Sequence, residues 1–254
     1  MHPTLDLNWF ELPVYTAIIM LGAAAGLLAA YLFLRSRSRR ASAVTVFLDG
    51  ALIALAAGWV GGRAYHVATH WEYYVARPEE IAQPDLGGLA MRGAVMLALI
   101  ALALYAAARQ IPFWWFADAA AIGLSIGQAI GWVGALIQGT NYGVVSDSQM
   151  AIDLPDLYGL VQPRFPLQHA EIALFALLFI GLLYAAFQRP RAGTLFVVYL
   201  LLGSLANFAL GFQRGDDTVY LGALRIDQVV DAGFVALAVL VGGWRRRVYE
   251  KKVK

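Results

Sequence analysis

Seven charged residues lie inside or at the edges of long apolar segments, where a charge is costly. They are Asp49, Arg63, Arg92, Asp118, Glu171, Asp227 and Asp231. Moving such a charge into a bilayer costs about 2.5 kcal/mol or more, so each needs a partner or a function. Pairing for structure is the simpler explanation for any one of them. Four of them, Arg63, Arg92, Glu171 and Asp227, fall toward the same ends of their segments, and we expect this set to surround one polar cavity.

A second group with chemical potential is the histidine pair His66 and His70. Their i, i+4 spacing places both rings on one helix face, where they are able to bind a metal. Zinc sites use three or four protein ligands, and the neighbouring Trp71, Tyr73 and Tyr74 are typical of a membrane-interface aromatic belt. We therefore expect no metal site and no cofactor.

The elements that must position these residues are membrane spans. The chain is 60% hydrophobic and only 14% charged, and about 20 apolar residues suffice for a helix to cross a bilayer. Seven spans are predicted, near Leu12–Leu34, Val44–Val67, Leu89–Ala108, Phe113–Ile137, Gln168–Phe187, Thr194–Phe212 and Ile226–Gly243. The sequence thus predicts an all-α integral membrane protein that forms a single membrane domain over residues 1–254.

The distribution of basic residues predicts the orientation. Thirteen of the nineteen Lys and Arg residues lie at 35–40, at 109, at 189–191 and after Trp244. The positive-inside rule places these segments in the cytoplasm, so the N-terminus lies outside and the C-terminus inside. Loops 70–88, 138–167 and 213–225 then face outward, and the basic tail 244–254 is cytoplasmic. Because the basic excess lies on one membrane face, it indicates topology and contact with anionic lipid, and not nucleic-acid binding.

The order of several motifs resembles prolipoprotein diacylglyceryl transferase. Gly62-Arg63 and the loop Arg77-Pro78-Glu79-Glu80-Ile81 are similar to its Gly-Arg and Pro-x-Glu-Ile segments. The run Gly87 to Gly93 resembles Gly-Gly-Met-x-x-His-Gly, and Gly131 to Thr140 resembles the signature Gly-Arg-Ile-Gly-Asn-Phe-Ile-Asn-Gly-Glu. Arg164 to Glu171 resembles Arg-His-Pro-Ser-Gln-x-x-Glu. Phe208, Phe212, Arg214 and Asp227-Gln228 fall on the last two motifs, Arg-Phe-x-x-Glu-Phe-x-Arg and Gly-Gln.

The resemblance implies a bacterial plasma (inner) membrane protein with several spans. In that family a diacylglyceryl group passes from phosphatidylglycerol to the cysteine thiol of a lipobox, and glycerol phosphate is released. Such a transfer needs cations on the phosphate and a base for the thiol.

Departures from the family pattern fall on the charged positions of the motifs. Trp132 stands for the signature arginine, Ala135 for its asparagine and Thr140 for its glutamate. Arg92 and Phe165 replace histidines. In the last-but-one span Asn207 replaces an arginine and Gly211 a glutamate. Each donor lost from such a site costs about 2.7–4 kcal/mol of transition-state stabilisation.

We therefore expect a divergent family member that no longer catalyses transfer and is retained as a lipid-binding or accessory membrane subunit. The residues expected at a lipid headgroup are Arg92, Arg164, Arg214, Gln168, Gln228 and Asn207. The expected ligand is a phosphatidylglycerol-like membrane phospholipid, with a membrane protein as a possible further partner.

Two other functions stay open. One is an active transferase with a rewired site, in which Arg92 or Arg164 holds the phosphate and Glu171 or His169 is the base. The other is a transporter or channel that uses the acids Asp49, Asp118, Asp227 and Asp231. No internal repeat of the kind that transporters show is visible in the sequence, so this last hypothesis is the weakest.

Overall fold

Seven long apolar helices form the body of the protein. The computed structural model describes residues 4–6, 11–37, 42–83 and 88–253. The helices are α1 (Val14–Arg37), α2 (Ser42–Thr69), α4 (Met91–Ala108), α5 (Phe113–Gln138), α6 (Leu167–Phe187), α7 (Thr194–Leu210) and α8 (Ile226–Val253). All seven are long and apolar enough to cross a membrane. The predicted class, an integral membrane protein with seven helical spans, is confirmed.

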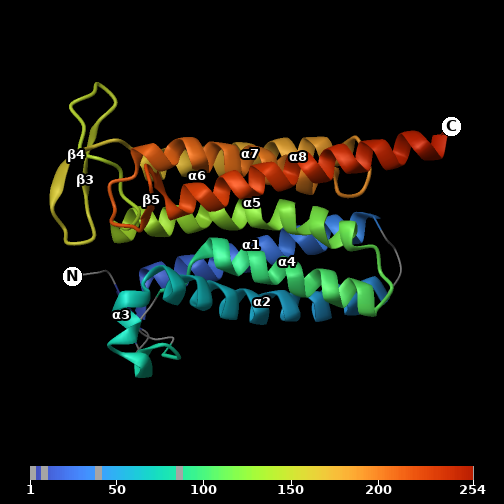
Figure 1. Ribbon diagram of the computed structural model, residues 1–254, viewed down its shortest axis with the longest axis horizontal. Coiled ribbons are helices and arrows are strands. Elements are labelled where there is room, and N and C mark those ends of the chain that lie inside the picture. The colour runs from blue at the N-terminus through green and yellow to red at the C-terminus, as the bar shows by residue number, and fades with distance from the viewer. Residues whose placement is uncertain (1–3, 7–10, 38–41, 84–87, 254) are drawn as a thin grey trace.

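The segments that were predicted to face outward contain short elements at one end of the bundle (Figure 1). They are β1 (Thr4–Asp6), β2 (Glu11–Pro13), α3 (Trp71–Val75), η1 (Pro78–Glu80), β3 (Ile152–Pro155), β4 (Val161–Arg164), η2 (Gly211–Gln213), β5 (Tyr220–Leu221) and β6 (Leu224–Arg225). In the described residues the strands form three two-stranded antiparallel hairpins, β1–β2, β3–β4 and β5–β6, with Ile152 opposite Arg164 in the second. We call this the loop end of the bundle, and the opposite end, which carries Arg37, Arg109 and Arg191, the basic end.

Helix α8 is longer than the predicted span. It continues without a break from Ile226 to Val253, so the basic segment after Trp244 is helical. No glycine or proline follows Gly243, and Arg and Lys are good helix formers that also suit a helix C-terminus. The apolar pattern marks where a span leaves the bilayer, and a helix is free to continue beyond that point.

Small residues bring two pairs of helices close together. A Cβ atom added to Gly26 of α1 would lie 2.6 Å from the carbonyl oxygen of Gly123 in α5, and one added to Gly22 would lie 2.9 Å from that of Gly127. In the same way Gly61 of α2 lies against Gly93 of α4. The glycines Gly123 and Gly127, four residues apart in α5, thus form a packing surface for α1.

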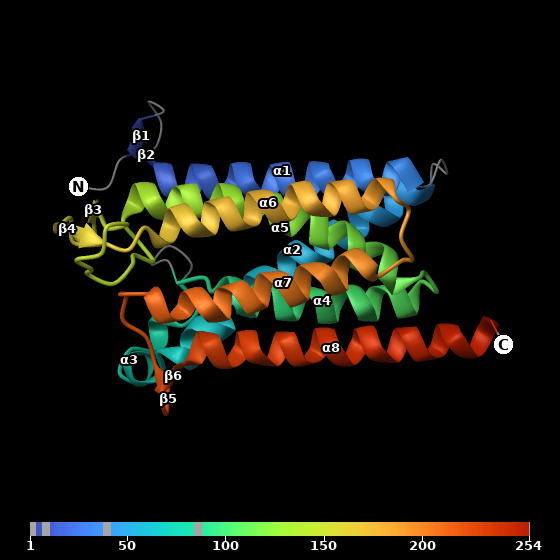
Figure 2. The same ribbon diagram turned by 90° about the horizontal axis from the view of Figure 1, so that it is seen from above.

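Helix α4 is well packed on one side only. It lies along α2, but it touches α5 sparsely and its backbone approaches that of α8 at few points. Figure 2 shows α4 beside both α7 and α8. Side chains, and not close backbone packing, therefore link α4 to α8.

The acids proposed for a transport path lie in separate places. Asp49 pairs with Arg109 (3.4 Å) near the basic end. Asp118 of α5 accepts hydrogen bonds from the backbone N–H groups of Gly193 (2.6 Å) and Phe196 (3.0 Å), at the start of α7. It therefore supplies the cap that the glycine at this helix N-terminus lacks. These two acids have structural partners far from Asp227 and Asp231, which removes the basis for the transport hypothesis.

Candidate functional site

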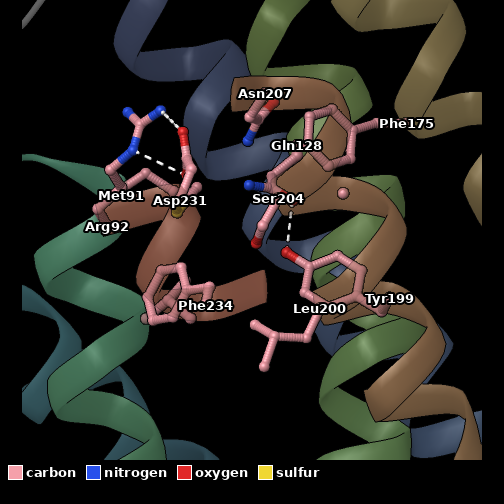
Figure 3. Close-up of a pocket in the computed structure, with 12 residues that line it drawn as sticks. Met91, Arg92, Gln128, Phe175, Tyr199, Leu200, Ser204, Asn207, Asp231 and Phe234 are labelled. Carbon is pink, nitrogen blue, oxygen red and sulfur yellow. Dashed lines mark hydrogen bonds and ion pairs between the residues drawn. The ribbon is translucent and has the colours of Figure 1, made fainter. Parts of the chain in front are cut away.

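A pocket opens among α4, α7 and α8 in the loop-end half of the bundle, with α5 and α6 behind it (Figure 3). It encloses about 380 Å³ of empty space, including the part open to the exterior. Its lining residues are Met91, Arg92, Val95, Gln128, Phe175, Tyr199, Leu200, Gly203, Ser204, Asn207, Asp231 and Phe234. The pocket is apolar at its walls and polar at two levels, a common arrangement for small-molecule sites.

The first polar level is an ion pair between Arg92 of α4 and Asp231 of α8. The guanidinium Nε and Nη2 donate to Asp231 Oδ1 and Oδ2 at 3.2 and 2.6 Å (Figure 3). Asp231 is 2% exposed. Two parallel hydrogen bonds between charged groups are among the strongest polar contacts in proteins. Arg92, predicted to meet a lipid headgroup, is therefore already bound to an acid of this chain.

Asp227, one turn before Asp231, is surrounded by donors. Its Oδ1 lies 3.3 Å from Arg92 Nη1 and accepts from the Tyr65 hydroxyl at 3.3 Å, and its Oδ2 lies 3.7 Å from Arg214 Nη1. The expected clustering of Arg92 and Asp227 is thus present. Tyr65 was not predicted here, because a tyrosine near a span end is usually part of the aromatic belt.

Arg214 follows η2 and is neutralised as well. It donates to Asp216 Oδ1 and Oδ2 at 2.9 and 2.6 Å and to Asn141 Oδ1 at 2.7 Å. Burial alone would lower the pKa of Arg214, but the hydrogen bonds and charge of Asp216, with help from Asp227, raise the pKa above its ordinary value. Asp216 also lies 3.3 Å from Arg225 Nη2. The guanidinium of Arg214 is therefore charged, and its charge is compensated.

Glu171 is the carboxylate of this region that lacks a cation. It is 3% exposed, and its partner is the side-chain amide of Asn207, whose nitrogen donates to Oε2 and Oε1 at 3.0 and 3.3 Å in the amide orientation that satisfies both groups. Within the described residues no Lys, Arg or His nitrogen lies within 4 Å of it. Glu171 is one helical turn from Phe175, which lines the pocket, so it lies at the outer edge of the cavity.

The second polar level lies deeper in the bundle. The Tyr199 hydroxyl donates to Gln128 Oε1 at 2.6 Å, and Ser204 lines the pocket nearby (Figure 3). None of these three was predicted as a site residue. Tyr199 and Ser204 belong to one apolar helix and Gln128 to another. Only the packing of α5 against α7 brings them together.

Several predicted residues lie outside the pocket. Arg164 Nη2 donates to Asp156 Oδ2 at 3.0 Å, a contact within the β3–β4 hairpin, and its Cζ lies 4.6 Å from the centre of the Tyr142 ring, which links the hairpin to the segment after α5. Arg63 donates to the carbonyl oxygens of Glu80 (2.5 Å) and Ile81 (2.9 Å), so it anchors the loop after α3. The structure does not bring either arginine to the group around Arg92.

The two predicted glutamines join helices. Gln168 Nε2 donates to the Thr140 carbonyl at 3.1 Å. Gln228 Nε2 donates to the Phe208 carbonyl at 3.0 Å, and Gln228 Oε1 accepts from the Arg225 backbone N–H at 3.0 Å. Both side chains are 1% exposed. Neither lines the pocket, where Arg92 and Asn207 are the headgroup candidates present.

The altered signature positions have apolar or packing roles. Trp132 lies against the core formed by α5, α6 and α7 and does not line the pocket. Ala135 is buried. A Cβ atom on Gly211 would lie 2.7 Å from Gln228 Cγ, so Gln228 occupies the space into which a longer side chain would project. Neither Trp132 nor Arg164 lines the pocket that Arg92 and Asn207 share.

Two further candidates, His169 and Phe165, lie close to the start of α6. His169 is exposed on α6, whereas its neighbours Gln168 and Glu171 are buried. Phe165 donates its backbone N–H to the Val144 carbonyl at 2.9 Å and so belongs to the loop framework. Of the two bases considered for a rewired site, Glu171 alone lies at the pocket edge.

The chain is similar in sequence to a known family of membrane proteins. The family model for prolipoprotein diacylglyceryl transferase matches residues 4–244. The chain belongs to this family. It is 32% identical over 235 residues to the phosphatidylglycerol–prolipoprotein diacylglyceryl transferase of Bacillus cytotoxicus, covering 90% of this chain and 86% of the relative. The proteins of that name from Bacillus cereus strain 03BB102 and Bacillus velezensis are 32% and 31% identical, with 93% and 95% of this chain covered and 89% of each relative.

Family membership and the seven spans together define the setting of the site. This member of the prolipoprotein diacylglyceryl transferase family is a multi-pass protein of the bacterial inner membrane. The resemblance stated from the motifs is confirmed. The paired charges of the pocket therefore lie in a protein whose family is named for a reaction of membrane lipids.

Proposed function

We propose that this protein binds a membrane phospholipid in the pocket between α4, α7 and α8 and does not transfer its diacylglyceryl group. The observation that carries the proposal is the state of Arg92, which is bound by two carboxylates, Asp231 at 2.6 Å and Asp227 at 3.3 Å. A guanidinium engaged in this way offers little net positive charge to a phosphate in the transition state. Arg214 is compensated by Asp216 in the same manner.

The shape of the site supports lipid binding. The pocket has a charged and amide-bearing edge at Arg92 and Asn207 and apolar walls at Val95, Phe175 and Phe234. Helix α4 has little backbone contact with α8, and we infer that an acyl chain enters between these two helices beyond the ion pairs of Arg92. An accessory role for such a lipid-bearing protein beside another membrane protein is part of this proposal.

A transfer assay tests the proposal. The purified protein is reconstituted with phosphatidylglycerol and a lipobox peptide, and the peptide mass is followed with the Bacillus cytotoxicus relative as a positive control. We expect the peptide to stay unmodified, while phosphatidylglycerol or another phospholipid co-purifies with the protein. Peptide modification by the wild-type protein would overturn the claim of lost transfer, and a lipid-free protein would overturn lipid binding.

A second candidate function is transfer by a rewired site. The observation that favours it is Glu171, a buried carboxylate at the pocket edge whose electrostatic neighbours include Arg214 and Arg92. If Glu171 were the base for the thiol, transfer would occur in the same assay and Glu171→Gln would abolish it. The Asp49→Asn variant, altered near the basic end, would keep full activity and serves as the matched control.

A further inference from the structure

At the pocket edge, carboxylates outnumber guanidinium groups. Three guanidinium groups, Arg92, Arg214 and Arg225, are paired with three carboxylates, Asp216, Asp227 and Asp231. Glu171 is a fourth carboxylate in the same region. Three positive charges against four negative charges leave one negative charge when every group is ionised. Such a site repels an anionic headgroup and attracts a cationic one.

Asp227 already occupies the place where an anion would be held. Its carboxylate lies between two guanidinium groups, at 3.3 Å from Arg92 and 3.7 Å from Arg214, and accepts from the Tyr65 hydroxyl at 3.3 Å. The family's Gly-Gln motif, on which Asp227-Gln228 falls, has no carboxylate at this position. An anionic headgroup would have to displace Asp227 from both arginines, and it would add its charge to a region that carries one net negative charge when every group is ionised.

Glu171 has the opposite character, because it is a buried acceptor without a cation. It is 3% exposed, and Asn207, its partner, stands where the family motif has arginine. A buried carboxylate is costly unless a positive group compensates it. Asn207 lines the pocket, and so does Phe175, one turn along α6 from Glu171. Because Asn207 both lines the pocket and donates to Glu171, a cationic group that takes the place of this amide would meet the carboxylate.

We propose that the lipid held in this pocket carries a primary ammonium in its headgroup, as a zwitterionic aminophospholipid such as phosphatidylethanolamine does, and that this ammonium pairs with Glu171. This inference rests on the proposed lipid binding, and it changes the preferred lipid from the phosphatidylglycerol for which the relatives are named.

Competition between headgroups tests the inference. The full-length protein is placed in nanodiscs with equal mole fractions of phosphatidylethanolamine, phosphatidylcholine and phosphatidylglycerol, released into mild detergent, and its retained lipids are counted by native mass spectrometry. We expect phosphatidylethanolamine to exceed phosphatidylglycerol about tenfold, the ratio that one hydrogen bond between charged groups supplies. Phosphatidylcholine carries the same charge without N–H donors and should be retained less than phosphatidylethanolamine.

Three variants assign the preference to the named groups. Glu171→Gln keeps the side-chain shape and should remove the preference while lipid is still retained. Asn207→Arg gives Glu171 an internal cation and should shift retention toward phosphatidylglycerol. Asp227→Gly should do the same, because it removes one carboxylate shared by Arg92 and Arg214, which keep Asp231 and Asp216 as partners. Asp49→Asn removes a carboxylate near the basic end and should leave the ratio unchanged.

The outcomes separate this inference from the proposed function. Equal or greater retention of phosphatidylglycerol by the wild-type protein would overturn the inference, and so would an unchanged ratio in Glu171→Gln, which would mean that the carboxyl group is protonated. In both cases lipid binding itself would stand. A wild-type protein that retains no lipid would overturn both proposals together.

Discussion

Arg92 of α4 and Asp231 of α8 form an ion pair with two hydrogen bonds, and it joins two helices whose backbones approach each other at few points. The two hydrogen bonds measure 3.2 and 2.6 Å, and Asp231 is 2% exposed. Helix α4 packs mainly against α2, whereas α8 packs mainly against α7. This ion pair and the contact of Arg92 with Asp227 thus fasten the α2–α4 hairpin to the remainder of the bundle at the edge of the pocket.

We expect Arg92→Leu to destabilise the protein by about 3–5 kcal/mol, because it leaves the buried Asp231 without its cation and leaves Asp227 with Arg214 alone. The loss should appear as a lower unfolding temperature in detergent, followed by circular dichroism. Adding Asp231→Leu should recover part of the loss. Arg109→Leu is the control, since the side chains of Arg109 and Asp49 are 58% and 39% exposed, and it should lower the unfolding temperature much less than Arg92→Leu does. Equal effects of Arg92→Leu and Arg109→Leu would contradict this prediction.

Gly26→Ala should weaken the contact between α1 and α5. Its Cβ atom would lie 2.6 Å from the Gly123 carbonyl oxygen, a backbone atom that has no freedom to rotate away. We expect a loss of about 1–3 kcal/mol, as for other overpacked sites. Gly181→Ala in α6 meets no atom within 4 Å and should leave the unfolding temperature unchanged or slightly higher. The prediction fails if the two variants unfold at the same temperature.

Asp118→Ala should loosen the start of α7. The carboxylate accepts from the N–H groups of Gly193 and Phe196, and removal of a helix cap typically costs about 0.5–2 kcal/mol. Hydrogen exchange at Thr194–Phe196 should become faster than in the wild-type protein. Asp118→Asn keeps one acceptor oxygen and should retain part of the protection. Unchanged exchange in Asp118→Ala would show that this contact does not stabilise α7.

The predicted orientation is testable because the chain has no cysteine. Tyr158→Cys places a thiol at a position that is 84% exposed in the connection between β3 and β4, and Trp244→Cys places one near the basic end at 58% exposure. If the loop end faces outward, a membrane-impermeant maleimide should label Cys at 158 in intact spheroplasts. It should label Cys at 244 only after the membrane is opened. The reverse pattern would invert the topology.

The membrane spans and the family both follow from local features of the sequence. Apolar length is a local property, so six of the seven helices end close to the predicted boundaries; α8 alone extends well past Gly243, because helix propensity continues beyond the apolar stretch. The motifs likewise led to the family, because glycines, prolines and loop residues keep their order even where the charged residues have changed.

Only the tertiary structure decided which charges meet. Sequence position placed Arg63, Arg92, Glu171 and Asp227 at the same depth, but depth does not give the direction of a side chain around its helix. Arg63 turns to its own loop, and Arg92 reaches Asp231, a residue 139 positions away. Pairing of this kind depends on which helices are neighbours and on their rotation, and it is this pairing that leaves Glu171 without a cation.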